Sequence, residues 1–324
     1  MNKTTKYHFI LGAPDPEMEM IKKLIIEHGH DVIYATRNGA RVRPHEMYQA
    51  DNCCIDVITV ECDGPNIQAR IKIDHHSPGD YGYGMPPEQY LKASSIGQIF
   101  GLLCMEKSKA GSGYYKYSLD CAQLLVYVVP DDGGIDRTDT YDVPQDLRFC
   151  AAADHCLTAA YAGKCPGVDP NDLMIWRAQS RAVFQKRSVE DILADVKAAM
   201  TALEDNARVN NVSFFGTYFS VCNGCGEKVI ADEYDESWDY CLCPPVADMR
   251  GSKIPELPEA ASRLGICFVS DGLRTPDGRM KVVCQSGTPE QIKAFMTIWA
   301  PKQGIMDIYG DPQRGFAGGY ITKP

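Results

Sequence analysis

The sequence predicts an α/β protein built on a parallel β-sheet, followed by a smaller mixed α/β domain. Within the first 75 residues, short apolar runs alternate with a segment whose apolar residues recur at helical spacing. This alternation of strand and helix is typical of a parallel sheet with flanking helices. After Asn206 the pattern changes to closely spaced strand-like runs. A length of 324 residues also suits two domains, and we place their boundary near residue 206.

The first domain is predicted over residues 1–206, with a helical linker from about 167 to 206. Its strands are expected in the runs YHFILGA, DVIYAT, DVITVE and ARIKID. Its helices are expected in DPEMEMIKKLIIEHGH, which stops at Gly29, in PPEQYLKASSIGQIFGLLCMEKS, in DLRFCAAADHCLTAAYAGK and twice within 170–206. Right-handed crossovers bring the carboxyl ends of parallel strands to one edge of the sheet. Residues that follow these strands should therefore converge.

The second domain is predicted over residues 207–324. Its strands are expected in VSFFGTYFSV, GICFVSDG and MKVVCQSG, its helix in PEQIKAFMTIWA, and the chain ends in a glycine-rich segment.

The composition excludes several classes of function. A net charge of −10 offers no global attraction to nucleic acid or to an anionic membrane, and an acidic protein that acts on phosphates usually needs metal ions. No apolar run approaches the roughly 20 residues of a membrane span, so we expect no membrane partner. The 14 cysteines are scattered through apolar segments, which indicates reduced thiols and a cytoplasmic location.

Acidic and histidine side chains recur at four places near the predicted sheet edge. They follow three strands and also lie in the small-residue helix: Asp15 and Glu17, Glu61 and Asp63, Asp74 with His75 and His76, and Asp154 with His155. Taken singly, an aspartate after a strand is more often a helix cap or a turn residue. Four such places in succession favour a site for two Mn²⁺ or Mg²⁺ ions, which can support in-line displacement at phosphorus.

These motifs resemble those of the DHH phosphoesterases, a family named for the triplet that Asp74, His75 and His76 reproduce. APDPEM is similar to the first motif, KIDHHSPGD to the third and FCAAADHCLTAAY to the fourth. DVITVECD resembles the second motif, with Glu61 where the family usually has Asp. Companion serines of the third motif are matched in KASSIGQIFGLL. The order of all four motifs agrees with that of the family.

The resemblance implies a role for each residue. The metal ligands would be Asp15, Glu17, Glu61, His75 and Asp154. His76 would face the scissile phosphate, and Asp74 would orient an imidazole. Asp63 is the alternative ligand of the second motif. His155 is extra to the pattern: it either packs or caps its helix, or it replaces the metal-binding His that the family often carries at the position of Leu11.

The second half resembles the substrate-binding domain that commonly follows a DHH domain. The segments that carry this resemblance are LPEAASRLGICFVSDG, GRMKVVCQSG and GDPQRGFAGGYITKP. The signature of that domain is a terminal Gly-Gly-Gly-His loop that grips a phosphate or a nucleotide. Gly318 and Gly319 fit this loop, and Tyr320 stands where the His would be. Arg314 is expected to add a charge-assisted contact to the same anion.

Four cysteines cluster in CNGCGEKVIADEYDESWDYCLC, which looks like an insertion over about 220–245. Cys222 and Cys225 form a C-x2-C pair, and Cys241 and Cys243 follow after fifteen residues as a C-x-C pair. Two interpretations stay open: one structural Zn²⁺ held by the four thiolates, or reduced free thiols on a surface hairpin.

The resemblance implies a metal-dependent phosphoesterase that hydrolyses phosphodiester or phosphomonoester bonds of short nucleotides by a metal-activated water. The substrate would be an oligoribonucleotide, a cyclic dinucleotide or a 3′-phosphoadenosine nucleotide. The alternatives are a single-strand-specific RecJ-like exonuclease, an inorganic pyrophosphatase, and a catalytically degenerate protein that binds or sequesters nucleotides. The last is motivated by departures from the family pattern at Leu11, Ala13, Glu17, Glu61 and Tyr320. A homodimer is a candidate assembly.

Overall fold

The computed structural model describes residues 6–44, 46–107, 114–119, 123–129, 137–209, 211–212, 219–221, 228–230, 246–275 and 278–322. The chain divides into two compact units, Met1–Arg181 and Ala182–Pro324. The predicted fold class is confirmed, since the first unit holds a parallel sheet with flanking helices and the second holds a separate mixed sheet. The domain boundary predicted near residue 206 stays a prediction.

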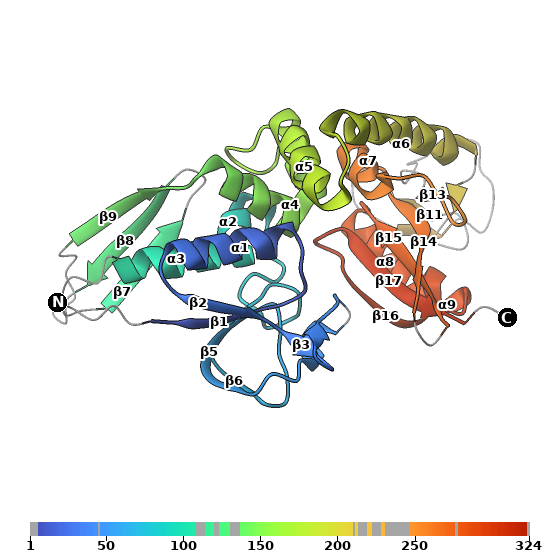
Figure 1. The fold of residues 1–324 in the computed structure, drawn as a ribbon. Helices are drawn as coiled ribbons and strands as arrows, with labels where there is room; N and C mark the ends of the chain where they lie inside the picture. The colour runs from blue at the N-terminus through green and yellow to red at the C-terminus, as the bar shows by residue number, and fades with distance from the viewer. Residues whose placement is uncertain are drawn as a thin grey trace. The chain divides into compact units, whose positions relative to one another are not determined.

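A four-stranded parallel sheet organises the first unit (Figure 1). Its strands are β1 (His8–Leu11), β2 (Asp31–Tyr34), β5 (Cys54–Val60) and β6 (Ile67–Ile73), in the order β2-β1-β5-β6. Leu11 pairs with Val60, and Val60 pairs with Ile73. The last residues of β1, β5 and β6 therefore lie side by side, as the sequence predicted for the strand ends.

Helices cover one face of this sheet and lie at the predicted places, but the helix expected over residues 86–108 is interrupted at Ser94. They are α1 (Pro16–Glu27), α2 (Tyr90–Ala93), α3 (Ser95–Lys107), α4 (Gln145–Tyr161) and α5 (Pro170–Gln185), with the short turn η2 (Pro87–Gln89). The short turn η1 (Met47–Gln49) lies between β2 and β5, and its Met47 packs on the opposite face. Phe9 and Leu11 of β1 pack in one apolar core with Ile21 and Ile25 of α1. Burying each such side chain contributes about 1.5–3 kcal/mol. No helix among the described residues is long and apolar enough to cross a bilayer.

The opposite face of the sheet carries a smaller core. It includes Ile10 of β1, Val57 of β5, and Val42 and Ala50 from the chain between β2 and β5. That connection also holds the short hairpin of β3 (Thr36–Arg37) and β4 (Ala40–Arg41). Alternate residues of β1 thus face two different cores, as expected for a strand inside a parallel sheet.

An antiparallel sheet in the first unit was not predicted from the sequence. It consists of β7 (Tyr114–Leu119), β8 (Gln123–Val129) and β9 (Arg137–Asp142), in that order. Leu124 and Val126 of β8 are buried in the core that the helices share. Their alternation along β8 places both side chains on the same face, which explains how the hairpins attach to the α/β layer.

The second unit contains a six-stranded mixed sheet. Its order is β10 (Asn211–Val212), β13 (Val246–Asp248), β14 (Phe268–Arg274), β15 (Met280–Gln285), β17 (Phe316–Ile321) and β16 (Met306–Asp311). A two-stranded ribbon joins β11 (Phe219–Val221) to β12 (Lys228–Ile230). The helical segments are α6 (Val189–Val209), α7 (Leu257–Leu264), α8 (Pro289–Ala294), the π-helical turn η3 (Phe295–Trp299) and α9 (Ala300–Lys302). Helix α8 begins at a capping box formed by Thr288 and Gln291.

The described cysteines, nine in number, are free thiols. The four cysteines predicted to bind zinc, Cys222, Cys225, Cys241 and Cys243, lie outside the described residues. The zinc site therefore stays a prediction.

Candidate metal centre

The carboxyl edge of the parallel sheet gathers the predicted acids and histidines. Asp15 follows β1 and caps α1, because its Oδ1 accepts a hydrogen bond from the Met18 N–H at 2.7 Å. Glu17 lies in the first turn of α1, and Glu61 directly follows β5. Both glutamates are only 3% exposed. Helix α4 contributes Asp154.

Two groups of ligand atoms form here, and Glu61 belongs to both. One contains Glu61, His75 and His76, and the other contains Glu17, Glu61 and Asp154, with the ligand atoms of each group within 4.8 Å of one another. His75 Nε2 lies 2.9 Å from Asp154 Oδ2 and 3.8 Å from Glu61 Oε1. A carboxylate shared by two groups is the arrangement in which one residue can bridge two cations.

The amino terminus of α3 holds the two glutamates in place. The Ser95 hydroxyl donates to Glu61 Oε1 at 2.8 Å, and the Ile96 N–H donates to Glu17 Oε1 at 2.9 Å. The first N–H groups of a helix have no partner within the helix, and the helix dipole favours negative charge at this end. Hydrogen bonds to charged groups contribute about 1.5–3 kcal/mol each, so α3 fixes both side chains firmly.

Glu61 also has a strained backbone, with φ at +51°. A non-glycine residue in this left-handed region costs on the order of 1 kcal/mol. The conformation is held by the sheet, since the Glu61 N–H donates to the Ile73 carbonyl at 2.9 Å. The strain turns the chain at the end of β5 and lets the Glu61 side chain reach α3.

Burial, and then the neighbouring carboxylates, raise the pKa values of Asp15 and Glu17. Burial, together with the negative charges of Glu61 and Asp154, raises the pKa of Asp15 to about 7. Burial and then Asp154, Glu61 and Asp15 raise the pKa of Glu17 well above its ordinary value. The site therefore concentrates negative charge that a divalent cation would neutralise.

Buried polar atoms without partners also fit a metal. Within the described part of the chain, Glu17 Oε2 and His75 Nδ1 are buried and make no hydrogen bond, whereas His75 Nε2 is paired with Asp154. An unpaired buried polar atom normally costs about 1–3 kcal/mol. Carboxylate oxygens and an imidazole nitrogen are the donor set that Mn²⁺ and Mg²⁺ sites use in proteins. The residues present therefore fit these ions.

Asp74 fixes the orientation of His76. Its Oδ1 accepts from His76 Nδ1 at 2.8 Å and from the backbone N–H groups of His75 and His76, and its Oδ2 accepts from the Tyr48 hydroxyl at 2.9 Å. Burial acts to raise the pKa of Asp74, but these hydrogen bonds outweigh it and hold the pKa below its usual value. The His76 side chain is 26% exposed whereas His75 is fully buried, so His76 lies on the open side of the site.

The two alternative ligands lie outside both groups, as does the predicted ligand Asp15. Asp63 forms an ion pair with Lys72 and accepts a hydrogen bond from the Gly64 N–H. His155 packs edge-on against His75, with ring centres 5.6 Å apart, and its Nε2 lies 3.0 Å from the Met85 carbonyl oxygen. His155 therefore makes packing contacts, and its role stays a prediction.

The glycines predicted to form a terminal loop lie in a strand. Gly318 and Gly319 are buried in β17, paired with Val283 and Val282 of β15, so the expected loop is wrong. A Cβ at Gly318 would lie 2.8 Å from the Tyr309 hydroxyl, and one at Gly319 would lie 2.4 Å from Ile305. Close packing within the sheet explains why glycine occupies these positions.

The other two residues predicted to contact substrate lie beside β17. Tyr320 ends this glycine stretch within the strand, with the Arg279 guanidinium 4.9 Å from its ring centre. Arg314 lies in the turn before β17, and its guanidinium lies 5.5 Å from the ring centre of Phe316. Both side chains are partly exposed.

Sequence reasoning missed the partners of the acids, namely Tyr48 and the first turn of α3. The segment KASSIGQ was noted only as a match to companion serines. A cap signal was present, because Ser94 Oγ accepts from the Gly97 N–H at 3.2 Å and so caps α3. No pattern around Tyr48 pointed to the site.

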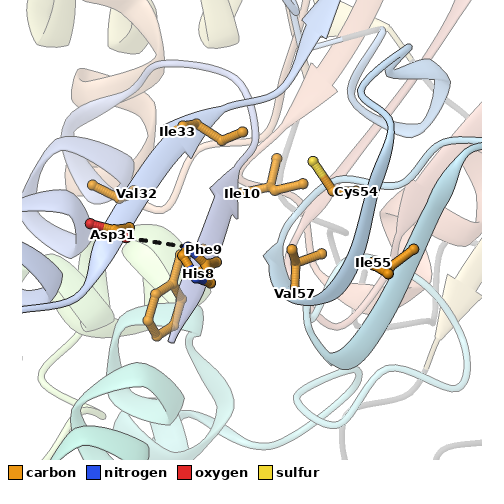
Figure 2. Close-up of a pocket in the computed structure, with 9 residues that line it drawn as sticks. All are labelled: His8, Phe9, Ile10, Asp31, Val32, Ile33, Cys54, Ile55 and Val57. Atoms are coloured by element: carbon orange, nitrogen blue, oxygen red, sulfur yellow. Dashed lines mark ion pairs between the residues drawn. The ribbon is translucent and has the colours of Figure 1, made fainter. Parts of the chain in front are cut away.

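A hollow of about 260 Å³ lies away from this centre (Figure 2). Residues of β1, β2 and β5 line it, none of them among the acids and histidines of the candidate metal centre, which follow the last residues of the strands. Its lining is mostly apolar, with one ion pair between His8 and Asp31 at 3.3 Å. The hollow is therefore separate from the candidate metal centre.

Comparison with known proteins gives little independent information. No protein-family model and no curated protein matches the chain. One solved structure, a pGpG-specific phosphodiesterase named PggH from Vibrio cholerae, aligns over 98% of this chain and 93% of its own, at a TM-score of 0.33 and 10% identity. A TM-score this low does not establish a common fold, so the interpretation of the site depends on its own residues.

Proposed function

We propose that this protein is a metal-dependent phosphoesterase of the DHH type that hydrolyses phosphodiester bonds of short nucleotides. The observation that carries the proposal is the sharing of Glu61 between two groups of ligand atoms at the carboxyl edge of a parallel sheet. Ligands commonly bind at this edge in α/β proteins. Buried acids with raised pKa values are also a frequent mark of a functional site.

Two Mn²⁺ or Mg²⁺ ions would be held by Asp15, Glu17, Glu61, His75 and Asp154. When bound, such ions neutralise phosphoryl oxygens and make water more acidic. The protein's own part is to position groups. Asp74 directs the ring of His76 toward the open side, where it can donate a hydrogen bond to a phosphate oxygen, and α3 keeps Glu17 and Glu61 aimed inward.

Arg314 and Tyr320 are our candidates for substrate contacts in the second unit, because both are partly exposed and polar. Gly318 and Gly319 would contribute through the close packing that shapes β17. The free thiols of the described cysteines support a reducing, cytoplasmic location as part of the same proposal.

The hydrogen bonds from the start of α3 to Glu17 and Glu61 favour an enzyme over a degenerate binding protein. A scaffold that had lost catalysis would have no need to hold Glu17 and Glu61 by one hydrogen bond each in a buried, mutually repelling cluster. Such a cluster destabilises the fold unless a cation compensates for it.

A substrate panel tests the proposal. Purified protein is incubated with Mn²⁺ and, separately, with a linear dinucleotide, a trinucleotide, a cyclic dinucleotide, 3′-phosphoadenosine 5′-phosphate and single-stranded DNA. We expect release of mononucleotide from the dinucleotide, no release with chelator, and loss of at least 100-fold in Glu61→Gln. Asp63→Asn is the matched control, because this nearby acid lies outside both groups. Tight nucleotide binding without turnover of any member of the panel would reject the enzyme.

A further inference from the structure

Two tyrosines, in segments that contact the Asp74–His76 triplet, have rings that are open to solvent. Tyr48 is 46% exposed and Tyr81 is 50% exposed. Tyrosine is enriched at binding interfaces because its ring offers apolar area and its hydroxyl a polar contact. Both rings belong to segments that contact the Asp74–His76 triplet, although they are far apart in sequence.

Tyr48 is tied to the centre through its hydroxyl. The hydroxyl donates to Asp74 Oδ2 at 2.9 Å, and the other oxygen of Asp74 accepts from His76. The backbone on both sides of Tyr48 is also fixed, since the Asp63 N–H donates to the Met47 carbonyl and the Ala50 N–H donates to the Asp63 carbonyl. The Tyr48 ring is therefore held in one place, since Tyr48 and His76 share the Asp74 carboxylate as a hydrogen-bond partner, and nearly half of the residue is exposed.

Tyr81 is tied to the centre through the backbone of its neighbour. A Cβ on Gly82 would lie 2.7 Å from His75 Cβ and 2.0 Å from the Ala93 carbonyl oxygen, so the chain at Gly82 packs directly on His75. The turn is stabilised by a hydrogen bond from the Asp80 N–H to the Ser77 carbonyl at 3.0 Å. Lys92 Nζ lies 5.8 Å from the centre of the Tyr81 ring and adds a positive charge beside it.

We propose that Tyr48 and Tyr81 are stacking platforms for the two bases of a linear dinucleotide whose phosphodiester lies at the candidate metal centre. The inference rests on the proposed function and names its substrate class. Stacking on a tyrosine accepts any base, because every base has a π-face. Two platforms at one centre suit a dinucleotide, and Lys92 supplies the charge for a flanking phosphate. The net charge of −10 gives no support to a longer strand.

A dinucleotide that carries 2-aminopurine in place of one base tests this directly, because stacking quenches 2-aminopurine fluorescence. Tyr48→Phe and Tyr48→Leu both lose the hydroxyl bond to Asp74, and they differ in the ring alone. The same comparison is made with Tyr81→Phe and Tyr81→Leu. We expect each Leu variant to bind about tenfold more weakly than its Phe partner, within the range measured for base stacking, and to lose the quenching. An abasic dinucleotide should bind equally to both members of each pair.

Tyr34 provides the matched control. Its hydroxyl donates to Glu19 Oε1 at 2.6 Å, as that of Tyr48 does to Asp74, but its ring lies under Arg41 and its partner is outside the centre. Tyr34→Leu should therefore bind the probe as Tyr34→Phe does. If Tyr48→Leu fails to fold in a thermal melt, the Tyr81 pair decides the outcome.

The results separate this inference from the proposed function. Unchanged quenching in a variant with both Leu substitutions overturns the platforms, even when the enzyme still cleaves the dinucleotide with Mn²⁺. Quenching that depends on both rings, in a protein that cleaves nothing, supports the platforms and rejects the phosphoesterase. A wild-type protein that does not quench the probe at any concentration also overturns the platforms.

Discussion

Without divalent cations, the first unit should lose stability as the pH rises. The pKa of Asp15 is raised from its ordinary 3.8 to about 7 in the fold, so folding favours the protonated carboxyl. This contribution is fully present below about pH 4 and is lost as the pH rises through 7. Burial and the neighbouring carboxylates raise the pKa of Glu17 as well, so its carboxyl adds to this loss.

The size of the effect follows from Asp15. Between pH 5 and pH 8 the contribution of Asp15 to the free energy of unfolding falls by the equivalent of about two pKa units. At about 1.4 kcal/mol per unit, this is about 3 kcal/mol at most. Asp15 is partly exposed, so solvent screening reduces this to about 2 kcal/mol. For a unit of this size the melting temperature should fall by about 4–8 °C. Mn²⁺ at 100 times its Kd restores about 2.7 kcal/mol, and it does so more at pH 8, where the ligands are deprotonated.

Thermal melts from pH 5 to pH 8, with chelator and with Mn²⁺, measure both effects. Glu17→Gln keeps an acceptor for the Ile96 N–H but removes one charge, so it should weaken the pH dependence and the response to Mn²⁺. Asp63→Asn should change neither, since its carboxylate pairs with Lys72. A metal-free melting temperature that rises from pH 5 to pH 8 would refute the reasoning, as would a Mn²⁺ response in Glu17→Gln equal to that of the wild type.

Three further outcomes are expected. His75→Gln should weaken Mn²⁺ binding at least tenfold in titration calorimetry, and an unchanged Kd would remove His75 from the ligand set. Gly82→Ala should lower stability by about 1–3 kcal/mol, read as a lower melting temperature, because its Cβ would lie 2.0 Å from the Ala93 carbonyl oxygen; a neutral substitution would show that the turn is loose. Protein purified without chelator should contain about one zinc per chain and Cys222→Ser should contain almost none, whereas a zinc-free wild type would favour free thiols.

The convergence of the acids could be predicted because it depends on strand order alone. Once β1, β5 and β6 are parallel neighbours, Leu11, Val60 and Ile73 must end at one edge, and whatever follows them meets there. The strands and most helices of the first unit could be predicted for a different reason, because each carries its own hydrophobic periodicity. The sheet β7-β8-β9 was not predicted because its register depends on pairing between strands and not on a periodicity within one segment.

The hydrogen-bond donors of the site could not be predicted in this way. The sequence indicated one continuous helix over residues 86–108, whereas the chain is extended at Ser94, with ψ at 151°, and a new helix starts at Ser95. Because of that break, the Ile96 N–H has no partner within the helix and donates to Glu17. Helical periodicity is similar on both sides of a break, so only the capping serine marks it.

Glu17 and Glu61 stand where the DHH motifs that the sequence resembles usually have aspartate. The break at Ser94 supplies hydrogen-bond donors at the distance that these longer side chains reach. A glutamate carboxylate lies one methylene farther from the backbone than that of an aspartate, so it needs partners that lie farther out. The Ser95 hydroxyl and the Ile96 N–H meet Glu61 and Glu17 at 2.8 Å and 2.9 Å. Shortening either side chain to aspartate would withdraw it from α3 and leave a buried donor unpaired, at a cost of about 1–3 kcal/mol. The longer acids and the start of α3 therefore form one arrangement, and Glu61→Asp should impair the site although aspartate is the usual residue of the DHH motif that this segment resembles.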